Sequence, residues 1–430
     1  MRASLILVTL LGKFLRVAAR LRGGGSAFPG YVVLKLMPDF IARATAQLEH
    51  GVIVVLGSNG KSTTTNMVTG IVSAHGDRVF TNPTGANMPQ GVASSLLGSL
   101  TLTGRLPFDI GVVEVDEAYG EVICRALKPR AGVMLNVQID QIYRLFEPDR
   151  VAGMFDRIAR QIDGTLVLNR DDAFLGALGD RLIADEGRDV VWFGVADSVL
   201  GAAKHGQVLA RNYDAEAAGT VAVDRPVAVE VMRSEGAEVT LRVHDDSHDL
   251  TLSARGLHNA VDAAAAIAVS EAAFGDDFSV DTAVAALGSM KTVYGRGELI
   301  TVGDREVEIV LMKSLASLQM NLDGFTASPD SVLMAFDEHS RDPSWLYAAD
   351  LSIIERVECL SGPKAVFLAL RLEYAGIPYE RTETDVEKAV QSLLDGPRPA
   401  SGRHTLILDY DQMILVRRYL GYRDLEAGAA

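Results

Sequence analysis

The sequence is poor in cysteine, and its cysteines do not form a metal-binding pair. Cys124 and Cys359 stand far apart among 430 residues, and no Cys-x-x-Cys occurs. A zinc site of four cysteines is excluded, and we expect no zinc in this protein. Two separated thiols fit the reducing cytosol, so we expect a cytoplasmic location. Cys124 has apolar neighbours and is expected to be a core thiol rather than a nucleophile.

The sequence also lacks an excess of positive charge. It contains 41 lysines and arginines against 56 aspartates and glutamates, which gives a formal net charge of −15. General nucleic-acid binding requires a basic surface that contacts phosphates, so we exclude nucleic acid as a partner. The same charge opposes broad adhesion to anionic lipid. The 48% of hydrophobic residues is sufficient for the cores of two or three domains.

The apolar run at the N-terminus is too short to cross a membrane. Leu5–Leu11 is soon followed by Lys13 and Arg16, whereas a spanning helix needs about 20 apolar residues. No small-residue cleavage site follows cleanly, so a signal peptide is not expected. We predict an amphipathic helix that packs on the protein, with a peripheral contact at the inner face of the cell membrane as the alternative. Its basic residues are Arg2, Lys13, Arg16, Arg20 and Arg22.

A strand, a glycine turn and a helix form the clearest functional pattern. Val52–Leu56 is an apolar, β-branched run typical of a buried parallel strand, and a helix is predicted to begin at Lys61. In such a turn main-chain N–H groups close around phosphate oxygens, a lysine adds positive charge and a serine oxygen reaches Mg²⁺. An ordinary tight turn is the alternative. The predicted ATP-binding residues here are Gly57, Ser58, Asn59, Gly60, Lys61, Ser62 and Thr63.

Polar side chains follow several predicted strands. Glu114 comes near the end of one, and Asn136 and Asn169 follow two later apolar runs, while Asn82–Gly91 is a polar loop beside the same edge. The carboxyl ends of parallel strands border the crevice where such sheets bind ligands. We predict that Glu114 and Ser62 ligate Mg²⁺, with a solvated acidic turn as the alternative for the glutamate. The pattern predicts one doubly wound sheet.

Two more residues are expected to contact the nucleotide. Asn259 follows His258 at the start of an alanine-rich helix, and it either faces the base or caps the helix. Arg296 stands between two glycines, where a cation would meet a phosphate oxygen at a domain boundary.

The order of the patterns predicts an α/β protein in three parts. A helical segment spans 1–48, and a mostly parallel P-loop domain spans 49–297 with an antiparallel patch at about 201–252. A smaller, Rossmann-like α/β domain follows from 298 to 424. It is expected to contain four strands, of which Ala365–Arg371 is the third.

In kind and in order, these motifs resemble the Mur ligase superfamily and, within it, the MurT type. The loop from Gly57, in the short Gly-x-x-Gly-Lys-Ser form, resembles the family's nucleotide loop, and Glu114–Ala118 resembles its acidic strand end. The stretch Arg341–Trp345 resembles the Arg-Asp-x-Ser-Trp signature of MurT-type C-terminal domains. The resemblance covers nearly the whole chain. The remaining matches, in family order, are Asn136–Gln141, Leu168–Asp172, Gly256–Asn259 and Tyr294–Glu298.

The resemblance implies an ATP- and Mg²⁺-dependent carbon–nitrogen ligase of peptidoglycan biosynthesis. MurT-type chains amidate the α-carboxylate of D-glutamate in the lipid II stem peptide, at the inner membrane face, together with a GatD-type glutaminase. This chain would convert that carboxylate to an acyl phosphate, and ammonia from glutamine would displace the phosphate. Lys61 and Arg296 would act on the phosphates. Asp342 would complete the partner's Cys–His pair, or else cap a turn before Pro343.

Departures from the family pattern leave other activities open. Many MurT chains carry a zinc ribbon that is missing here, and the residues after Lys313 and before Arg341 differ from the family's usual ones. One alternative is a Mur-like ligase that adds an amino acid or peptide directly, as poly-γ-glutamate or folate-type ligases do. Another is a catalytically silent nucleotide-binding subunit. The presence of four residues opposes it, namely Lys61, Ser62, Glu114 and Arg296.

Overall fold

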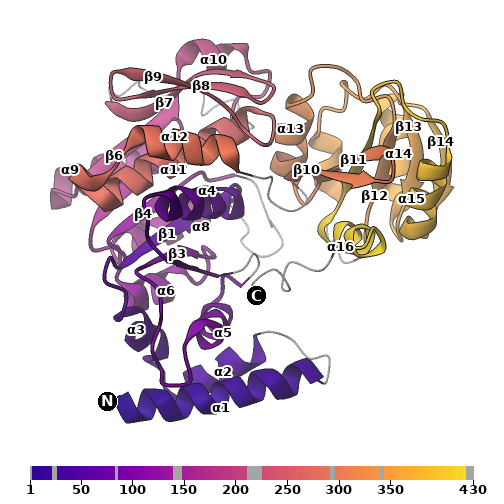
Figure 1. Ribbon diagram of the computed structural model, residues 1–430. Helices are drawn as coiled ribbons and strands as arrows, with labels where there is room; N and C mark the ends of the chain where they lie inside the picture. The colour runs from indigo at the N-terminus through magenta and orange to yellow at the C-terminus, as the bar shows by residue number, and fades with distance from the viewer. Residues whose placement is uncertain are drawn as a thin grey trace.

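The computed structural model describes residues 2–21, 27–82, 86–138, 148–210, 225–290, 296–338 and 343–422. Along the chain, a lobe of helices precedes a domain built on a nine-stranded sheet and a second domain built on a six-stranded sheet (Figure 1). The predicted α/β class is confirmed. In the described ranges, no helix is long and apolar enough to cross a membrane.

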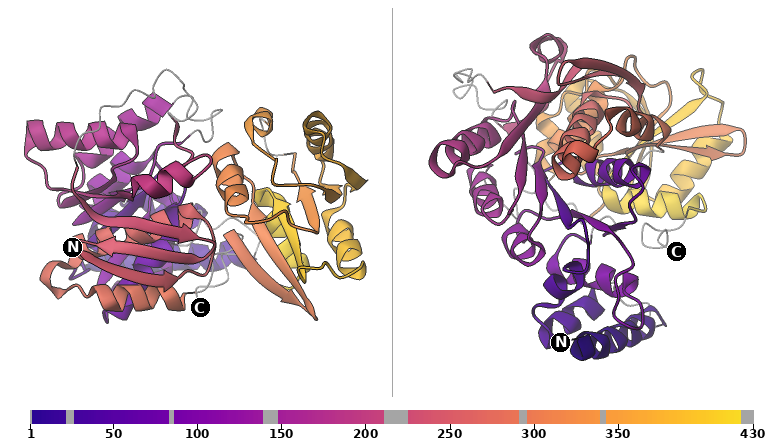
Figure 2. Two further views of the ribbon diagram at one scale, coloured as in Figure 1. Left: turned by 90° about the horizontal axis from the view of Figure 1, so that it is seen from above. Right: turned by 60° about the vertical axis from the view of Figure 1, so that its left-hand side comes forward.

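The N-terminal lobe consists of α1 (Arg2–Leu21), α2 (Phe28–Leu36) and α3 (Phe40–Thr45). These three helices lie within the helical segment predicted over 1–48. Helix α1 lies at the outer edge of the molecule (Figures 1 and 2). Its close contact with the lobe depends on Gly12, where a Cβ would meet Leu97 and Val33 side-chain carbons at 2.7–2.9 Å.

The central sheet begins with parallel strands and ends with an antiparallel patch. Strands from β2 to β7 pair in parallel, and β7, β8 and β9 pair antiparallel as an extension of the same sheet. The antiparallel patch was expected to start near residue 201, but its first strand starts at Val227. The strands in spatial order are β2 (Val79–Thr81), β3 (Ile110–Glu114), β1 (Val52–Leu56), β4 (Ala131–Met134), β5 (Thr165–Asn169), β6 (Val190–Val195), β7 (Val227–Glu235), β8 (Glu238–Val243) and β9 (Asp246–Thr251).

Helices cover both faces of this sheet, which is why its central parallel strands are mainly apolar. In β1, Val54 and Leu56 pack into the core on one face, and Ile53 and Val55 into the core on the other. The first of these faces carries α5 (Pro89–Ser99), α6 (Gly120–Leu127), α8 (Pro148–Ala159) and α9 (Ala173–Glu186), and the second carries α4 (Lys61–Ala74), α11 (Leu257–Phe274) and α12 (Val280–Ser289). The short α10 (Asp197–Ala202) follows β6.

The C-terminal domain repeats this design on a smaller scale. Only β10 and β11 pair antiparallel among its described strands. Its strands in spatial order are β10 (Arg296–Val302), β11 (Arg305–Leu311), β15 (Arg403–Leu408), β12 (Val332–Ala335), β13 (Val357–Ser361) and β14 (Tyr379–Glu383). One face carries α13 (Leu315–Asp323), the 3₁₀ turn η4 (Ser344–Ala348) and α14 (Ala365–Ala375), and the other carries α15 (Val386–Asp395) and α16 (Tyr410–Tyr419).

Two expectations about this domain are wrong. Its described residues form six strands rather than four, and Ala365–Arg371 lies in helix α14 instead of forming a strand. The buried residues Ala365, Leu368 and Leu372 recur at helical spacing on one face of α14. A short, continuous apolar run occurs in buried strands and in buried helices alike. The run by itself therefore does not show which of the two forms.

Candidate functional site

The glycine turn between β1 and α4 has the geometry of an anion-binding loop. Gly57 and Gly60 both have positive φ angles, +151° and +86°, and Gly60 occupies the N-cap position of α4. A Cβ on Gly60 would meet Asp262 Oδ1 at 2.4 Å. The loop therefore requires glycine here, and it directs the positive end of the α4 dipole into the site.

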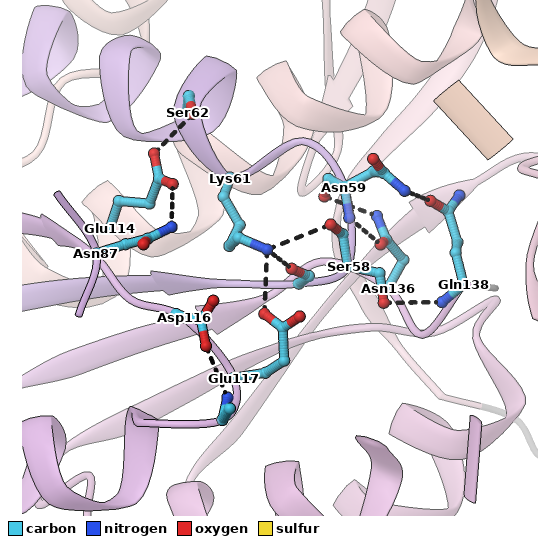
Figure 3. A network of polar contacts seen from close by, with 12 residues as sticks. Ser58, Asn59, Lys61, Ser62, Asn87, Glu114, Asp116, Glu117, Asn136 and Gln138 are labelled. Atoms are coloured by element: carbon cyan, nitrogen blue, oxygen red, sulfur yellow. Dashed lines mark hydrogen bonds and ion pairs between the residues drawn. The ribbon is translucent and has the colours of Figure 1, made fainter. Parts of the chain in front are cut away.

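Lys61 is buried in this loop and paired with a carboxylate. Its Nζ donates to the Gly57 carbonyl at 2.5 Å, to the Ser58 carbonyl at 3.2 Å and to Glu117 Oε2 at 3.1 Å (Figure 3). The side chains of Lys61 and Glu117 are only 10% and 2% exposed. Glu117 was not predicted as a site residue, although the acidic run at the end of β3 signalled it. An ammonium held this way can exchange its carboxylate partner for a phosphate oxygen.

The two predicted Mg²⁺ ligands lie in contact. Ser62 Oγ donates to Glu114 Oε2 at 2.7 Å, and Asn87 Nδ2 donates to Glu114 Oε1 at 3.0 Å (Figure 3). Asn82 exchanges hydrogen bonds of 2.9 Å with both main-chain groups of Glu114, which holds the end of β3 in place. Thr63 is buried beside Ser62 in the first turn of α4.

A hydroxyl and a carboxylate are hard oxygen donors, so this pair fits Mg²⁺. Within the described ranges, no group of three or more histidine, cysteine, aspartate or glutamate residues could hold a metal. Ser62 and Glu114 would supply a hydroxyl and one carboxylate, which is the usual arrangement when Mg²⁺ keeps waters and phosphate oxygens as its other ligands.

Amide side chains beyond β4 hold the other side of the loop. Asn136 Oδ1 accepts from the Asn59 main-chain N–H at 3.0 Å, and Asn59 Nδ2 donates to Gln138 Oε1 at 2.7 Å. The Gln138 N–H donates to Ser58 Oγ at 3.0 Å (Figure 3). Asp140 and Gln141, which the family pattern includes, lie outside the described residues.

A cavity of about 940 Å³ opens beside the loop, between the two domains. This volume is within the range of small-molecule sites. Both domains contribute to its wall, so their relative position sets its shape. The lining includes Asn59 and Gly60 of the loop, Gln138 after β4, His258 and Asp262 of α11, and Met320 and Asp323 of α13.

His258 and Asn259 are adjacent in sequence but differ in their position relative to the cavity. His258 lines the cavity, whereas Asn259 is buried, donates from Nδ2 to the Arg255 carbonyl at 2.8 Å and lies 3.1 Å from His258 Nε2. Gly256 is the N-cap residue of α11, so Asn259 does not cap this helix. Asn259 therefore positions His258, and a contact of Asn259 with a nucleotide stays a prediction.

Two predicted catalytic residues are not placed. Arg296 begins β10, so this strand starts before the predicted domain boundary at 298, but the Arg296 side chain lies outside the described part of the structure. Asp342 also lies outside the described residues. Trp345, three residues later, packs edge-on against Phe336 with 6.1 Å between ring centroids. Cys124 is buried in α6, and burial raises the pKa of its thiol to about 12, as suits a core residue.

Charged side chains join the domains around the cavity. Arg255 pairs with the buried Glu308 at 2.6 Å and stacks 4.1 Å above the Phe325 ring. Lys204 pairs with Asp350, and its hydrogen bond holds the pKa of that carboxyl well below the usual range. His205 Nδ1 lies 2.9 Å from the carboxylate of Asp323 on α13.

Known proteins resemble the chain in both sequence and fold. Residues 55–270 match the Mur ligase middle domain. The lipid II isoglutaminyl synthase (glutamine-hydrolyzing) subunit MurT of Streptococcus pneumoniae is 26% identical over 434 residues, covering 94% of each chain. MurF from Acinetobacter baumannii has a TM-score of 0.66 at 16% identity, covering 91% of this chain and 79% of its own. MurF from Thermotoga maritima, solved in complex with ADP, has a TM-score of 0.65 at 16% identity, covering 90% and 84%. The matched middle domain accounts for half of the sequence, and the chain therefore belongs to the Mur ligase family.

Proposed function

We propose that this chain is the carboxylate-activating subunit of a lipid II isoglutaminyl synthase. The observation that carries the proposal is the similarity to MurT over 94% of both chains, because it includes the C-terminal domain as well as the nucleotide loop. The amidated group would be the α-carboxylate of D-glutamate in the stem peptide. Ammonia would come from glutamine, through a GatD-type glutaminase bound to this chain.

The site supports ATP as the phosphoryl donor. The triphosphate would lie at the N-terminus of α4 with Lys61 and Ser62, and the adenosine would enter the cavity beside Asn59 and His258. Mg²⁺ held by Ser62 and Glu114 would neutralise charge on the phosphate oxygens. Lys61 would leave Glu117 and turn to the transferred phosphoryl group, with Arg296 contributing a second cation.

The reaction needs positioned charges rather than a protein nucleophile. A substrate carboxylate oxygen bonds to the γ-phosphorus as the bond to the ADP oxygen breaks, which leaves an acyl phosphate. Ammonia then attacks the acyl carbon, loses a proton, and inorganic phosphate departs with the bonding electron pair. The domain contacts around the cavity hold the two halves of this site together.

The C-terminal domain offers a surface for the glutaminase. On α14, Val366, Leu370 and Tyr374 are exposed, and the Tyr374 ring packs edge-on against Tyr347 of η4 at 6.1 Å. Exposed apolar surface of this kind marks protein–protein contacts. Because η4 follows the stretch that carries Asp342, we place the partner here, where Asp342 would reach the partner's Cys–His pair. The complex would work in the cytoplasm, at the inner face of the membrane.

The test is to co-purify the protein with a GatD-type glutaminase, and then to add lipid II, ATP and glutamine. Mass spectrometry should detect the small mass decrease that accompanies conversion of a carboxylate to an amide. Coupling of an amino acid without the glutaminase would instead favour a direct ligase. No magnesium-dependent affinity for ATP would contradict the site itself.

Two variants separate the roles within this proposal. Lys61→Ala should abolish ATP turnover while the fold and the partner contact remain; full activity would mean that the phosphate site is wrongly assigned. Asp342→Asn should reduce glutamine-driven amidation far more than ATP binding, and an equal loss of both would indicate a structural role for Asp342.

A further inference from the structure

The outer face of α1 exposes a continuous apolar stripe. Leu7, Leu10, Leu11, Phe14 and Val17 are each between 42% and 69% exposed. Their spacing of three, four and seven residues places them on one side of the helix. Helix α1, which carries this stripe, lies at the edge of the molecule, at the end opposite the β7–β9 patch (Figures 1 and 2).

Packing within the protein does not account for this stripe, because a different face of α1 serves that purpose. Leu5, Thr9 and Gly12 are buried against the lobe. Helix α2 packs closely beside α5, since a Cβ on Gly30 would lie 2.0 Å from the Gln90 carbonyl oxygen. The lobe is therefore already a packed unit, and α2 exposes three more large apolar side chains. These are Phe28, Tyr31 and Leu36.

The charge of this lobe is opposite to that of the whole protein. The chain has no acidic residue before Asp39, although its net charge is −15. Lys35 is exposed on α2 and lies 5.7 Å above the Tyr31 ring, and Lys13 donates to the Gly98 carbonyl at 3.3 Å. The six basic residues of the segment are Arg2, Lys13, Arg16, Arg20, Arg22 and Lys35.

We propose that the outer faces of α1 and α2 form a docking surface for an anionic lipid bilayer. Apolar side chains would enter the interface between headgroups and acyl chains, and the exposed Lys35 of α2 would meet the anionic headgroups. A second copy of this chain would bring the same positive charge to the contact, which opposes self-association through this face.

The inference rests on the proposed function for its purpose, since docking would bring the site to a lipid-linked substrate. Helix α5 connects the two, because its C-terminal end packs on α1 and its N-terminal end follows Asn87, which contacts Glu114. Docking through α1 leaves the C-terminal domain, with its proposed partner surface, away from the lipid (Figure 1).

The test is co-sedimentation of the full chain with vesicles, without ATP, lipid II or glutaminase, so that its outcome is independent of the amidation assay. The protein should bind vesicles of phosphatidylcholine mixed with phosphatidylglycerol, and high salt should weaken the binding. Leu11→Gln/Phe14→Gln should lower the partition coefficient by about tenfold or more, because it removes apolar area that drives insertion. Lys35→Glu should weaken binding to the mixed vesicles, whereas Lys388→Glu on α15 should not.

Val17→Gln is a milder variant at an exposed position, and Val122→Gln on α6 is its matched control, with 58% and 61% exposure in the parent residues. Only Val17→Gln should weaken vesicle binding. Three results would overturn the proposal: no binding to the mixed vesicles, equal binding by the α1 variants, or a wild-type dimer that Leu11→Gln/Phe14→Gln converts to monomer.

Discussion

Gly60 is a residue where backbone strain and a close contact together require glycine. Ala at a left-handed position costs about 1–2 kcal/mol, and here its Cβ would also collide with Asp262 Oδ1. We expect Gly60→Ala to lower the free energy of unfolding and to abolish ATP binding. Gly187, at the end of α9, also has positive φ but open space around it.

Gly187→Ala is therefore the matched control for Gly60→Ala. It should show only the backbone cost, with ATP binding unchanged. Thermal melts and nucleotide titration of both variants measure the difference. Equal behaviour of the two variants would mean that the Asp262 contact does not shape the loop.

The buried ion pair of Lys61 and Glu117 leads to a second prediction at the scale of single residues. Glu117→Gln leaves the Lys61 ammonium without its carboxylate partner, which should cost about 1–3 kcal/mol of unfolding free energy. ATP supplies new anionic partners, so the variant should gain more thermal stability from Mg-ATP than the wild type does. Glu121→Gln removes an exposed ion pair with Arg125. It should change neither the melting temperature without ATP nor the increase that Mg-ATP produces. A Glu117→Gln melt equal to the wild type without ATP would contradict this account.

At the scale of elements, the local hydrophobic pattern predicted a strand correctly where both faces of the strand are buried. β1 is apolar over its whole length and is a strand, as expected. Ala365–Arg371 has the same apolar character but forms α14, in which the buried positions follow a helical period. Composition alone does not resolve this choice, because a short apolar run is compatible with a buried strand and with a buried helix.

The start of β15 carries a histidine whose charge state affects stability. Burial and the Arg305 guanidinium hold the pKa of His404 below its ordinary value. The neutral ring accepts from Arg305 and lies 2.8 Å from Ser331 Oγ, which donates to Glu358. The unfolded chain takes up a proton near pH ~6.5. The contribution of neutral His404 to the free energy of unfolding is therefore complete above that pH. It is lost as pH falls through the lower pKa of the folded state.

We expect the thermal midpoint of the wild type to fall on mild acidification by more than that of His404→Gln. His248→Gln, a change on β9, should retain the wild-type slope. Thermal melts at a series of pH values measure these slopes. If His404→Gln and wild type have parallel slopes, His404 does not supply the pH dependence.

Substitution of exposed side chains on α14 tests the proposed contact with the glutaminase. Val366→Glu should weaken co-purification with the glutaminase, because it places a charge in an apolar contact. Val122→Glu on α6 has a similar parent exposure, 61% against 67%, and should leave the complex intact. Loss of the complex in both variants, or in neither, would contradict the assignment of this face.

At the scale of the whole molecule, the domain contacts determine whether the cavity exists. Glu308 is buried and pairs with Arg255 across the domains, whereas the nearby Glu306 is exposed and pairs with Arg403 within the C-terminal sheet. Glu308→Gln should therefore raise the Kd for ATP about three- to tenfold, since a buried pair contributes more than an exposed one. Glu306→Gln should leave it unchanged.

Small-angle scattering without nucleotide would provide the second measurement of this contact. The Glu308→Gln protein should have a larger radius of gyration than the wild type or Glu306→Gln. An unchanged radius together with unchanged ATP affinity would show that other contacts hold the domains.

The sequence by itself determined the features that depend on neighbouring residues. The turn from Gly57 to Lys61, the strand before it and the polar strand ends all follow from local backbone preference and periodicity. The meeting of Ser62 and Glu114 was predictable for a different reason, because the carboxyl ends of the strands in a parallel sheet lie at one edge.

Only the tertiary structure decided which surfaces meet. It brought Glu117 to Lys61 and Asn87 to Glu114, and it placed His258 rather than Asn259 at the cavity wall. It also showed that α1 packs through one face and exposes another apolar face. These outcomes depend on contacts between residues far apart in sequence, and a side chain's own pattern does not specify its distant partner.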